Sequence, residues 1–117
     1  MESKLIAKYE VDGYPCTIIR GTLGALLGYV DVPAGHPWYG LATWAEELED
    51  MISADVHGGV TYSAAHGDGW RVGFDCAHHG DHVPGLNRTP HSWETYRDEA
   101  FVRREIDSLV RQAKEVA

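Results

Sequence analysis

The chain has 117 residues, of which 44% are hydrophobic and 24% are charged, and this is the composition of one ordinary globular domain. Its amino terminus lacks the apolar run of a secretion signal, and no stretch approaches the roughly 18 apolar residues of a membrane span. We therefore expect a cytoplasmic protein without membrane attachment, with Cys16 and Cys76 as reduced thiols.

The negative charge of the chain, −8 in total, is confined to its middle part. Between residues 21 and 87, Arg71 is the only basic residue against nine acidic ones, whereas the two flanking segments carry equal numbers of each sign. Because an acidic surface repels phosphates, we expect no direct binding of nucleic acid. The expected partner is a small molecule or a basic protein that docks on an acidic face, and the alternative is a plain solvated surface.

Five apolar segments predict strands. The first three cover residues 5–11, 14–20 and 25–32, and the Asp12-Gly13 pair between the first two is suited to a hairpin turn. Two further candidates, residues 59–63 and 70–74, are joined by a loop over residues 64–69 that contains Gly and Asp. The pattern predicts a mainly antiparallel sheet of about five strands.

Two helices are predicted from apolar residues at helical spacing. A shorter central helix of about 12 residues is indicated by one such stripe, formed by Leu41, Trp44, Leu48, Met51 and Ile52. A long C-terminal amphipathic helix is expected over residues 96–116, with Thr95 as its N-cap. Its apolar face packs on the sheet, or alternatively forms a homodimer, and consists of Val102, Ile106, Leu109, Val110 and Ala113. The whole chain, residues 1–117, is thus interpreted as a single α+β domain.

Candidate metal ligands gather in one interval. Five of the seven histidines lie between His57 and His82, and Asp75, Cys76 and Asp81 lie in the same interval. Imidazoles and carboxylates are ligands for divalent ions such as zinc, and we select His57, Asp75 and His78 as metal ligands, with Asp81 as a fourth ligand or as the orienting partner of an imidazole. The spacing matches no zinc finger or His-Glu-x-x-His helix. A hydrogen-bonded site without metal and a loop of surface histidines remain as alternatives, and Cys76 is interpreted as core in preference to a ligand.

The predicted pairing of residues 59–63 with residues 70–74 bears on this cluster. A hairpin would place His57 and Asp75 at the same open end, within roughly 5–8 Å across paired strands. His66 would then lie near the tip of a mobile loop as an ordinary solvated histidine. The sequence therefore predicts one site formed by His57 and the Asp75–Asp81 loop.

A second feature is the loop Gly35-His36-Pro37-Trp38-Tyr39-Gly40. Its aromatic residues are able to wall a pocket or to cap the hydrophobic core. In the first case His36 is a candidate general base.

Several motifs of this chain resemble a family of small uncharacterised proteins from bacteriophages, prophages and actinobacterial genomes. They are Gly28-Tyr29-Val30, Gly35-His36-Pro37, His57-Gly58-Gly59 with Thr61-Tyr62, and Gly73-Phe74-Asp75-Cys76-Ala77-His78 with Gly80-Asp81. The resemblance covers roughly residues 14–112, and the acidic segment near residues 43–52 and the second histidine, His79, look like local departures. It implies a phage-related context and gives weight to His36, His57, Asp75, His78 and Asp81, but it supplies no reaction.

Together these patterns favour a small metal-binding domain that hydrolyses a small phosphorylated or nucleotide-like substrate. A divalent ion on His57, Asp75 and His78 would activate a water molecule, and Asp81 or His36 would be the catalytic base. Against this, Arg71 and Arg88 are the only nearby basic residues that could hold a phosphate. The alternative is a non-enzymatic phage-type inhibitor or ligand-sequestering protein with an acidic docking face.

Overall fold

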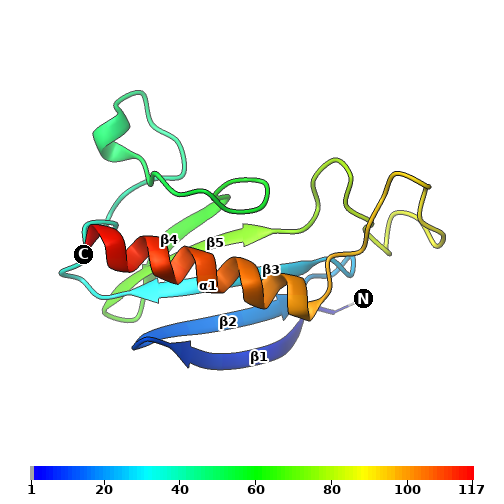
Figure 1. Cartoon of the computed structure of the whole chain (residues 1–117), viewed down its shortest axis with the longest axis horizontal. Coiled ribbons are helices and arrows are strands. Elements are labelled where there is room, and N and C mark those ends of the chain that lie inside the picture. The colour runs from blue at the N-terminus through cyan, green and yellow to red at the C-terminus, as the bar shows by residue number, and fades with distance from the viewer. Residues whose placement is uncertain (1) are drawn as a thin grey trace.

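A computed structural model of the chain describes residues 2–117 and shows a five-stranded antiparallel sheet with one C-terminal helix (Figure 1). The strand order is β1-β2-β3-β5-β4, so that β3 lies at the centre of the sheet. The elements are β1 (Lys4–Val11), β2 (Tyr14–Arg20), β3 (Leu26–Val32), β4 (Tyr62–His66), β5 (Gly69–Asp75) and α1 (Glu99–Val116). The predicted antiparallel sheet and long C-terminal helix are confirmed.

The two hairpins follow from residues that tolerate positive φ. Asp12 and Gly13, with φ of 50° and 88°, form the predicted turn between β1 and β2. The β4–β5 turn is tighter than expected, because His66 already pairs with Gly69 and only two residues lie between them. At the other end, Gly58 and Gly59 have φ of 69° and 83° and cannot extend a strand, so β4 begins at Tyr62 and not at residue 59.

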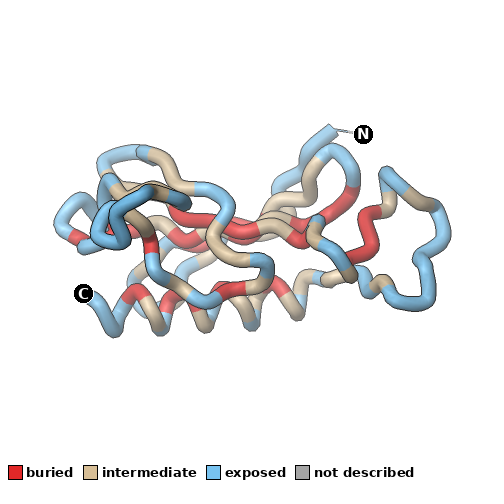
Figure 2. Tube along the Cα trace, turned by 90° about the horizontal axis from the view of Figure 1, so that it is seen from above, coloured by how far each residue is buried: buried red, intermediate tan, exposed pale blue. Residues whose placement is uncertain are grey.

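The core lies between α1 and one face of the sheet (Figure 2). The apolar face of α1 is buried as predicted, and Ile106 and Leu109 have no exposed surface. Opposite them the strands contribute Ile18, Val30, Val72 and Phe74, all at most 1% exposed. Cys16 and Cys76 are buried as free thiols, and burial raises the pKa of Cys76 to about 12, in line with its interpretation as a core residue.

The predicted shorter central helix is wrong. Residues 41–52 form a projecting loop with only a 3₁₀ turn, η1 (Leu48–Asp50), and the loop is closed by backbone hydrogen bonds from Ala42 to Asp50 and from Ile52 to Ala42. Trp44 is 72% exposed and Leu48 is 82% exposed, so the middle of the apolar stripe packs on no surface, although Ile52 at its end is buried in the core. A helix of about 12 residues is marginal without such packing, and close like charges oppose it further; the acids are Glu46, Glu47, Glu49 and Asp50.

Helix α1 begins at Glu99, three residues later than expected, and its N-cap is Asp98 and not Thr95. The Asp98 carboxylate accepts a 2.9 Å hydrogen bond from the Phe101 amide. Thr95 instead forms a parallel bridge with Asp81 and receives a 2.8 Å hydrogen bond from the His82 amide. This pairing ties the segment before α1 to the loop after β5. No helix within residues 2–117 is both long enough and apolar enough to cross a bilayer.

Candidate functional site

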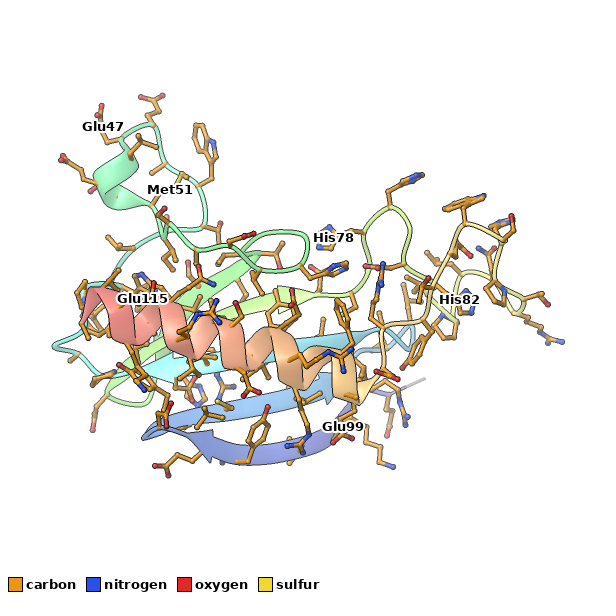
Figure 3. All side chains as sticks on the ribbon, viewed as in Figure 1. Glu47, Met51, His78, His82, Glu99 and Glu115 are labelled. Atoms are coloured by element: carbon orange, nitrogen blue, oxygen red, sulfur yellow. The ribbon has the colours of Figure 1, made fainter. Side chains whose placement is uncertain are left out.

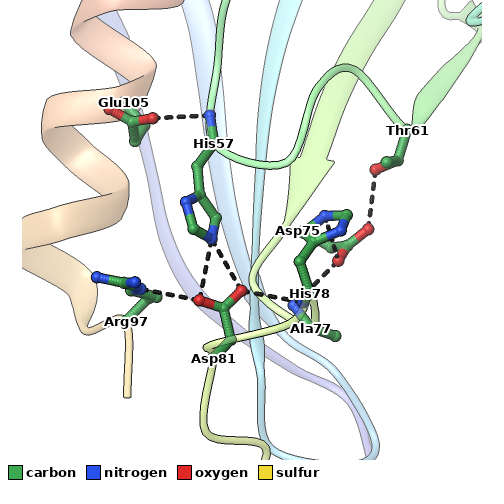
Figure 4. A network of polar contacts seen from close by, with 8 residues as sticks. All are labelled: His57, Thr61, Asp75, Ala77, His78, Asp81, Arg97 and Glu105. Atoms are coloured by element: carbon green, nitrogen blue, oxygen red, sulfur yellow. Dashed lines mark hydrogen bonds and ion pairs between the residues drawn. The ribbon is translucent and has the colours of Figure 1, made fainter. Parts of the chain in front are cut away.

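The loop that follows β5 and the segment that precedes β4 meet near the start of α1 (Figure 4). This brings together four of the five residues selected from the sequence, His57, Asp75, His78 and Asp81. The imidazole rings of His57 and His78 are 5.9 Å apart between centroids, nearly perpendicular at 77°. The four side chains form two histidine–carboxylate pairs, Asp81–His57 and Asp75–His78.

The first pair is built on a buried carboxylate. The Asp81 side chain has no exposed surface, and its oxygens lie 3.0 and 2.8 Å from Nε2 of His57. Arg97 donates its Nε–H to Oδ1 at 2.8 Å, and the backbone N–H of His78 donates to Oδ2 at 3.0 Å. Asp81 therefore connects three segments of the chain: the segment that precedes β4, the loop after β5 and the segment that precedes α1.

Electrostatics keep Asp81 ionised. Burial alone would raise the pKa of its carboxyl group, but hydrogen bonds from Arg97, His57 and the His78 backbone outweigh burial and lower the pKa below the ordinary 3.8. An ionised carboxylate only accepts hydrogen bonds, so His57 must carry its proton on Nε2. The backbone N–H of His57 is in turn held by Glu105 of α1 at 2.8 Å, which fixes the histidine from both sides.

The second pair is more open. The His78 and Asp75 side chains are 32% and 27% exposed, and Nε2 of His78 lies 3.1 Å from Oδ1 of Asp75. The contact is short but poorly aligned for a hydrogen bond, so this buried nitrogen has no hydrogen-bond partner within residues 2–117. Asp75 itself is fixed by the Thr61 hydroxyl at 2.9 Å and the Ala77 N–H at 3.0 Å.

Gly58 explains how the two pairs come so close. A Cβ atom at this position would overlap the His78 ring, so only glycine leaves room for the imidazole to lie on the backbone next to His57. Its φ of 69° is also a conformation that favours glycine. Gly59 has an equally positive φ, but a Cβ there would meet nothing within 4 Å. The His-Gly-Gly motif thus forms a turn and also leaves the space that the His78 ring occupies.

Two hollows border the loop that carries His78. One, of about 510 Å³, lies against the β2–β3 turn and is lined by Asp75 and His78 together with mainly apolar residues. The other, of about 200 Å³, is lined by His78 and Asp81 and extends to Trp93. His78 is therefore the histidine that faces both hollows, and His57 lines neither of them.

His36 lies elsewhere. Its Nε2 is 2.8 Å from the Ala113 carbonyl, and its Nδ1 accepts a 3.0 Å hydrogen bond from the Trp38 backbone. Ala113 is near the end of α1, about 20 Å along the helix from the Asp81 cluster at its start. Both ring nitrogens of this buried histidine are occupied, so the structure leaves His36 outside the cluster and gives it a role in holding the 33–40 loop on α1.

The remaining histidines of the interval make their contacts outside the two pairs, and one of them, His82, is labelled away from His78 in Figure 3. His82 is buried, and its Nδ1 lies 3.4 Å from the Glu94 carboxylate. His79 stacks on Trp93 with ring centroids 5.0 Å apart. His66 ends β4, and its side chain, 50% exposed, lies 3.8 Å from Asp31.

The groups selected as metal ligands are close together but are not arranged as a coordination sphere. Within residues 2–117, no group of three or more His, Cys, Asp or Glu side chains converges on one point where a metal ion would sit. The Nε2 of His57 faces Asp81, whereas the Nε2 of His78 faces Asp75. Metal binding would therefore require at least one imidazole to turn.

Three contributors to the site are absent from the sequence-based selection: Arg97, Glu105 and Thr61. Arg97 precedes α1 and Glu105 lies within it, and their i, i+8 spacing carries no signal for a site on another segment. Thr61 lies in the His-Gly-Gly-x-Thr-Tyr motif. Its place four residues after His57 is the one sequence signal that indicates a role for its hydroxyl group in the site. Comparison of the chain with protein-family models, curated proteins and solved structures finds no match.

Proposed function

We propose that this chain binds a small substrate beside His78 and hydrolyses it, with His78 as the acid–base group. The observation that carries the proposal is that His78 combines a carboxylate partner at 3.1 Å with a place on the wall of a hollow of about 510 Å³. A hollow of this volume fits a small molecule. A histidine next to a carboxylate is a common proton acceptor at neutral pH.

The Asp75 carboxylate has a defined task in this reaction. When His78 takes a proton, the ring becomes a cation, and the carboxylate 3.1 Å away stabilises that charge. With its Nε2 turned to Asp75, His78 has Nδ1 left to exchange a proton with a bound water. Hydrogen bonds from Thr61 and the Ala77 backbone hold the carboxylate in place.

The proposed step is the hydrolysis of an ester. His78 removes a proton from a water molecule while the water oxygen forms a bond to the ester carbonyl carbon. The resulting tetrahedral intermediate then collapses, the carbon–oxygen bond to the alcohol breaks, and His78 returns its proton to the leaving oxygen. The products are one acid and one alcohol, and no redox change is involved.

The Asp81–His57 pair acts in this scheme as support. Asp81 holds the His78 backbone N–H, and the His57 ring packs at right angles to the His78 ring. Neither side chain of this pair needs to touch the substrate. Both are positioning residues for His78.

Hydrolysis of p-nitrophenyl acetate, an uncharged activated ester, tests the proposal. General-base catalysis contributes about 10²-fold or more, so His78→Ala should lower the rate by about that factor, and Asp75→Asn should lower it by a smaller one. His66→Ala is the matched control, because it removes an imidazole that touches neither hollow next to His78. Equal rates for His78→Ala and His66→Ala overturn the hydrolase and favour a non-enzymatic ligand-binding protein.

A divalent metal site is the second candidate, and zinc is the ion that suits its donors. The buried, unpartnered Nε2 of His78, the adjacent Asp75 carboxylate and the neighbouring His57 ring supply two imidazoles and one carboxylate within a short distance. The Asp81 carboxylate would then orient His57, as carboxylates do behind metal-bound histidines. A rotation of one ring would complete this donor set.

Calorimetric titration of tag-free protein with zinc chloride decides on the metal. Binding of one ion per chain that is lost in both His57→Ala and His78→Ala, and kept in His66→Ala, would establish the site. Absence of binding, or binding that survives both substitutions, would contradict it. The hydrolysis assay is run with and without a chelator, so that a metal-independent reaction is recognised as such.

A further inference from the structure

The larger hollow beside His78 has mainly apolar walls. Leu23 of the β2–β3 turn and Leu27 of β3 lie on one side, and Val83 and Leu86 of the loop after β5 lie on the other. Leu23 and Leu86 are 48% and 67% exposed, values that leave much apolar surface in contact with water. A ligand that covers these side chains would gain hydrophobic free energy in proportion to the apolar area it buries.

The two walls are held together by specific contacts. The Gly85 N–H donates a 2.6 Å hydrogen bond to the Leu23 carbonyl, and the Tyr96 hydroxyl donates a 3.1 Å hydrogen bond to the Gly24 carbonyl. A Cβ at Gly24, whose φ is 94°, would lie 3.2 Å from Pro84, so the turn and the loop are in close contact. The hollow is therefore preformed, which lowers the entropic cost of binding.

The charge of the hollow is set by Asp75. Its carboxylate and the His78 imidazole are the ionisable groups of the lining, which contains no Lys or Arg. The nearest basic side chain along the chain, Arg20, pairs with Leu26 and so points to the helix-covered face, whereas Leu27 pairs with Asp75 on the opposite face. Arg97 is bound to Asp81 on the helix side of the site. The lining of this hollow thus supplies no cation to hold a phosphate.

We infer that the substrate of this site has an apolar body and a head that carries no negative charge, such as an ester or an amide. This inference rests on the proposed function, and it replaces the phosphorylated or nucleotide-like substrate expected from the sequence. The apolar body lies between the Leu23–Leu27 wall and the Val83–Leu86 wall. The uncharged head reaches the Asp75–His78 pair, where an anionic head would be repelled by the carboxylate.

Two probes of similar size and opposite character test this: benzamide, which is uncharged, and phenylphosphonate, which is anionic. Binding to the full chain is followed by NMR chemical-shift titration at the backbone amides of Leu23, Leu27 and Leu86. Repulsion by one carboxylate at short range predicts that phenylphosphonate binds about tenfold more weakly than benzamide. Asp75→Asn removes that charge and should reduce the difference between the two probes.

Substitutions of the residues that line the hollow test whether the probes bind there. Leu86→Ala should weaken benzamide binding, whereas Leu48→Ala, which truncates an even more exposed leucine on the 41–51 loop, should leave it unchanged. Phenylphosphonate that binds as tightly as benzamide, or benzamide shifts that do not respond to Leu86→Ala, would overturn the inference. Benzamide binding in this hollow without ester hydrolysis would uphold the ligand class and reject only the hydrolase.

Discussion

The two histidine–carboxylate pairs have the same chemical groups but opposite environments. Asp81 is fully buried and accepts hydrogen bonds from His57, from Arg97 and from the backbone of His78. Asp75 is 27% exposed, and its partner His78 is 32% exposed and borders two hollows. Sequence composition alone does not distinguish these pairs, because each consists of one Asp and one His. They differ in sequence separation, which is 3 residues for Asp75–His78 and 24 residues for His57–Asp81.

The difference shows how burial separates a stabilising role from a chemical role in a small site. A fully occupied, buried carboxylate has no acceptor left for a ligand, and its loss exposes three donors to a low dielectric. A carboxylate at the surface stabilises a protonated histidine beside it and leaves that histidine open to a ligand. We therefore assign stability to the Asp81–His57 pair and chemistry to the Asp75–His78 pair.

The largest expected effect follows from removing each carboxylate. Asp81→Ala leaves Arg97, His57 and the His78 amide without their acceptor and should lower the free energy of unfolding by about 3–5 kcal/mol. Asp75→Ala loses partly solvated hydrogen bonds and should cost about 1 kcal/mol. Urea unfolding of both variants checks this, and equal losses would remove the distinction between the pairs.

Gly58 and Gly59 supply a smaller and more local comparison. Both have positive φ, so alanine at either position strains the backbone, but only at Gly58 does the new Cβ overlap the His78 ring. We expect Gly58→Ala to be less stable than Gly59→Ala by about 1–3 kcal/mol, the usual cost of overpacking.

Ester hydrolysis separates the two glycines further. Gly58→Ala should lose the His78-dependent rate, since the displaced ring leaves Asp75, and Gly59→Ala should retain it. Equal stability and equal rates in the two variants would show that the His78 ring does not pack against Gly58.

The smallest expected effect is the pH dependence of the buried pair. Because the pKa of Asp81 is lowered on folding, its contribution to stability is present in full above the ordinary pKa of 3.8 and is lost as the pH falls through the folded value. The difference in unfolding free energy between the wild type and Asp81→Asn should be constant from neutral pH to about pH 5 and shrink in stronger acid. A difference that already falls near neutral pH would show that another group controls the pair.

The fold could be predicted where patterning is local. The Asp12-Gly13 turn, four of the five strands and the apolar face of α1 follow from period and turn chemistry, and the structure confirms them, whereas β4 begins three residues later than predicted. The absence of a central helix could not be predicted from the apolar spacing of residues 41–52. Helical spacing does not reveal that Trp44 and Leu48 have no surface of the protein to pack against. Thr95 failed as a cap for a similar reason, since its backbone is taken by the Asp81 bridge.

The site was predictable in part. Hairpin geometry brought His57 and Asp75 to one end of the sheet, and the structure places His78 and Asp81 beside them. Which carboxylate is buried could not be predicted, because burial of Asp81 depends on Arg97 from a segment 16 residues away. His36 shared the signals of a site residue, but its two hydrogen bonds to α1 and Trp38 are visible only in the folded chain.

We assign the chemistry to His78 and the support of the fold to His57. The most direct test of this assignment measures urea stability and p-nitrophenyl acetate hydrolysis on the same samples of His57→Gln and His78→Gln. We expect His78→Gln to keep nearly all of the wild-type stability and to hydrolyse the ester about 10²-fold more slowly, whereas His57→Gln should lose stability because it loses its contact with buried Asp81. A stable His57→Gln protein without activity, together with an active His78→Gln protein, would contradict this assignment.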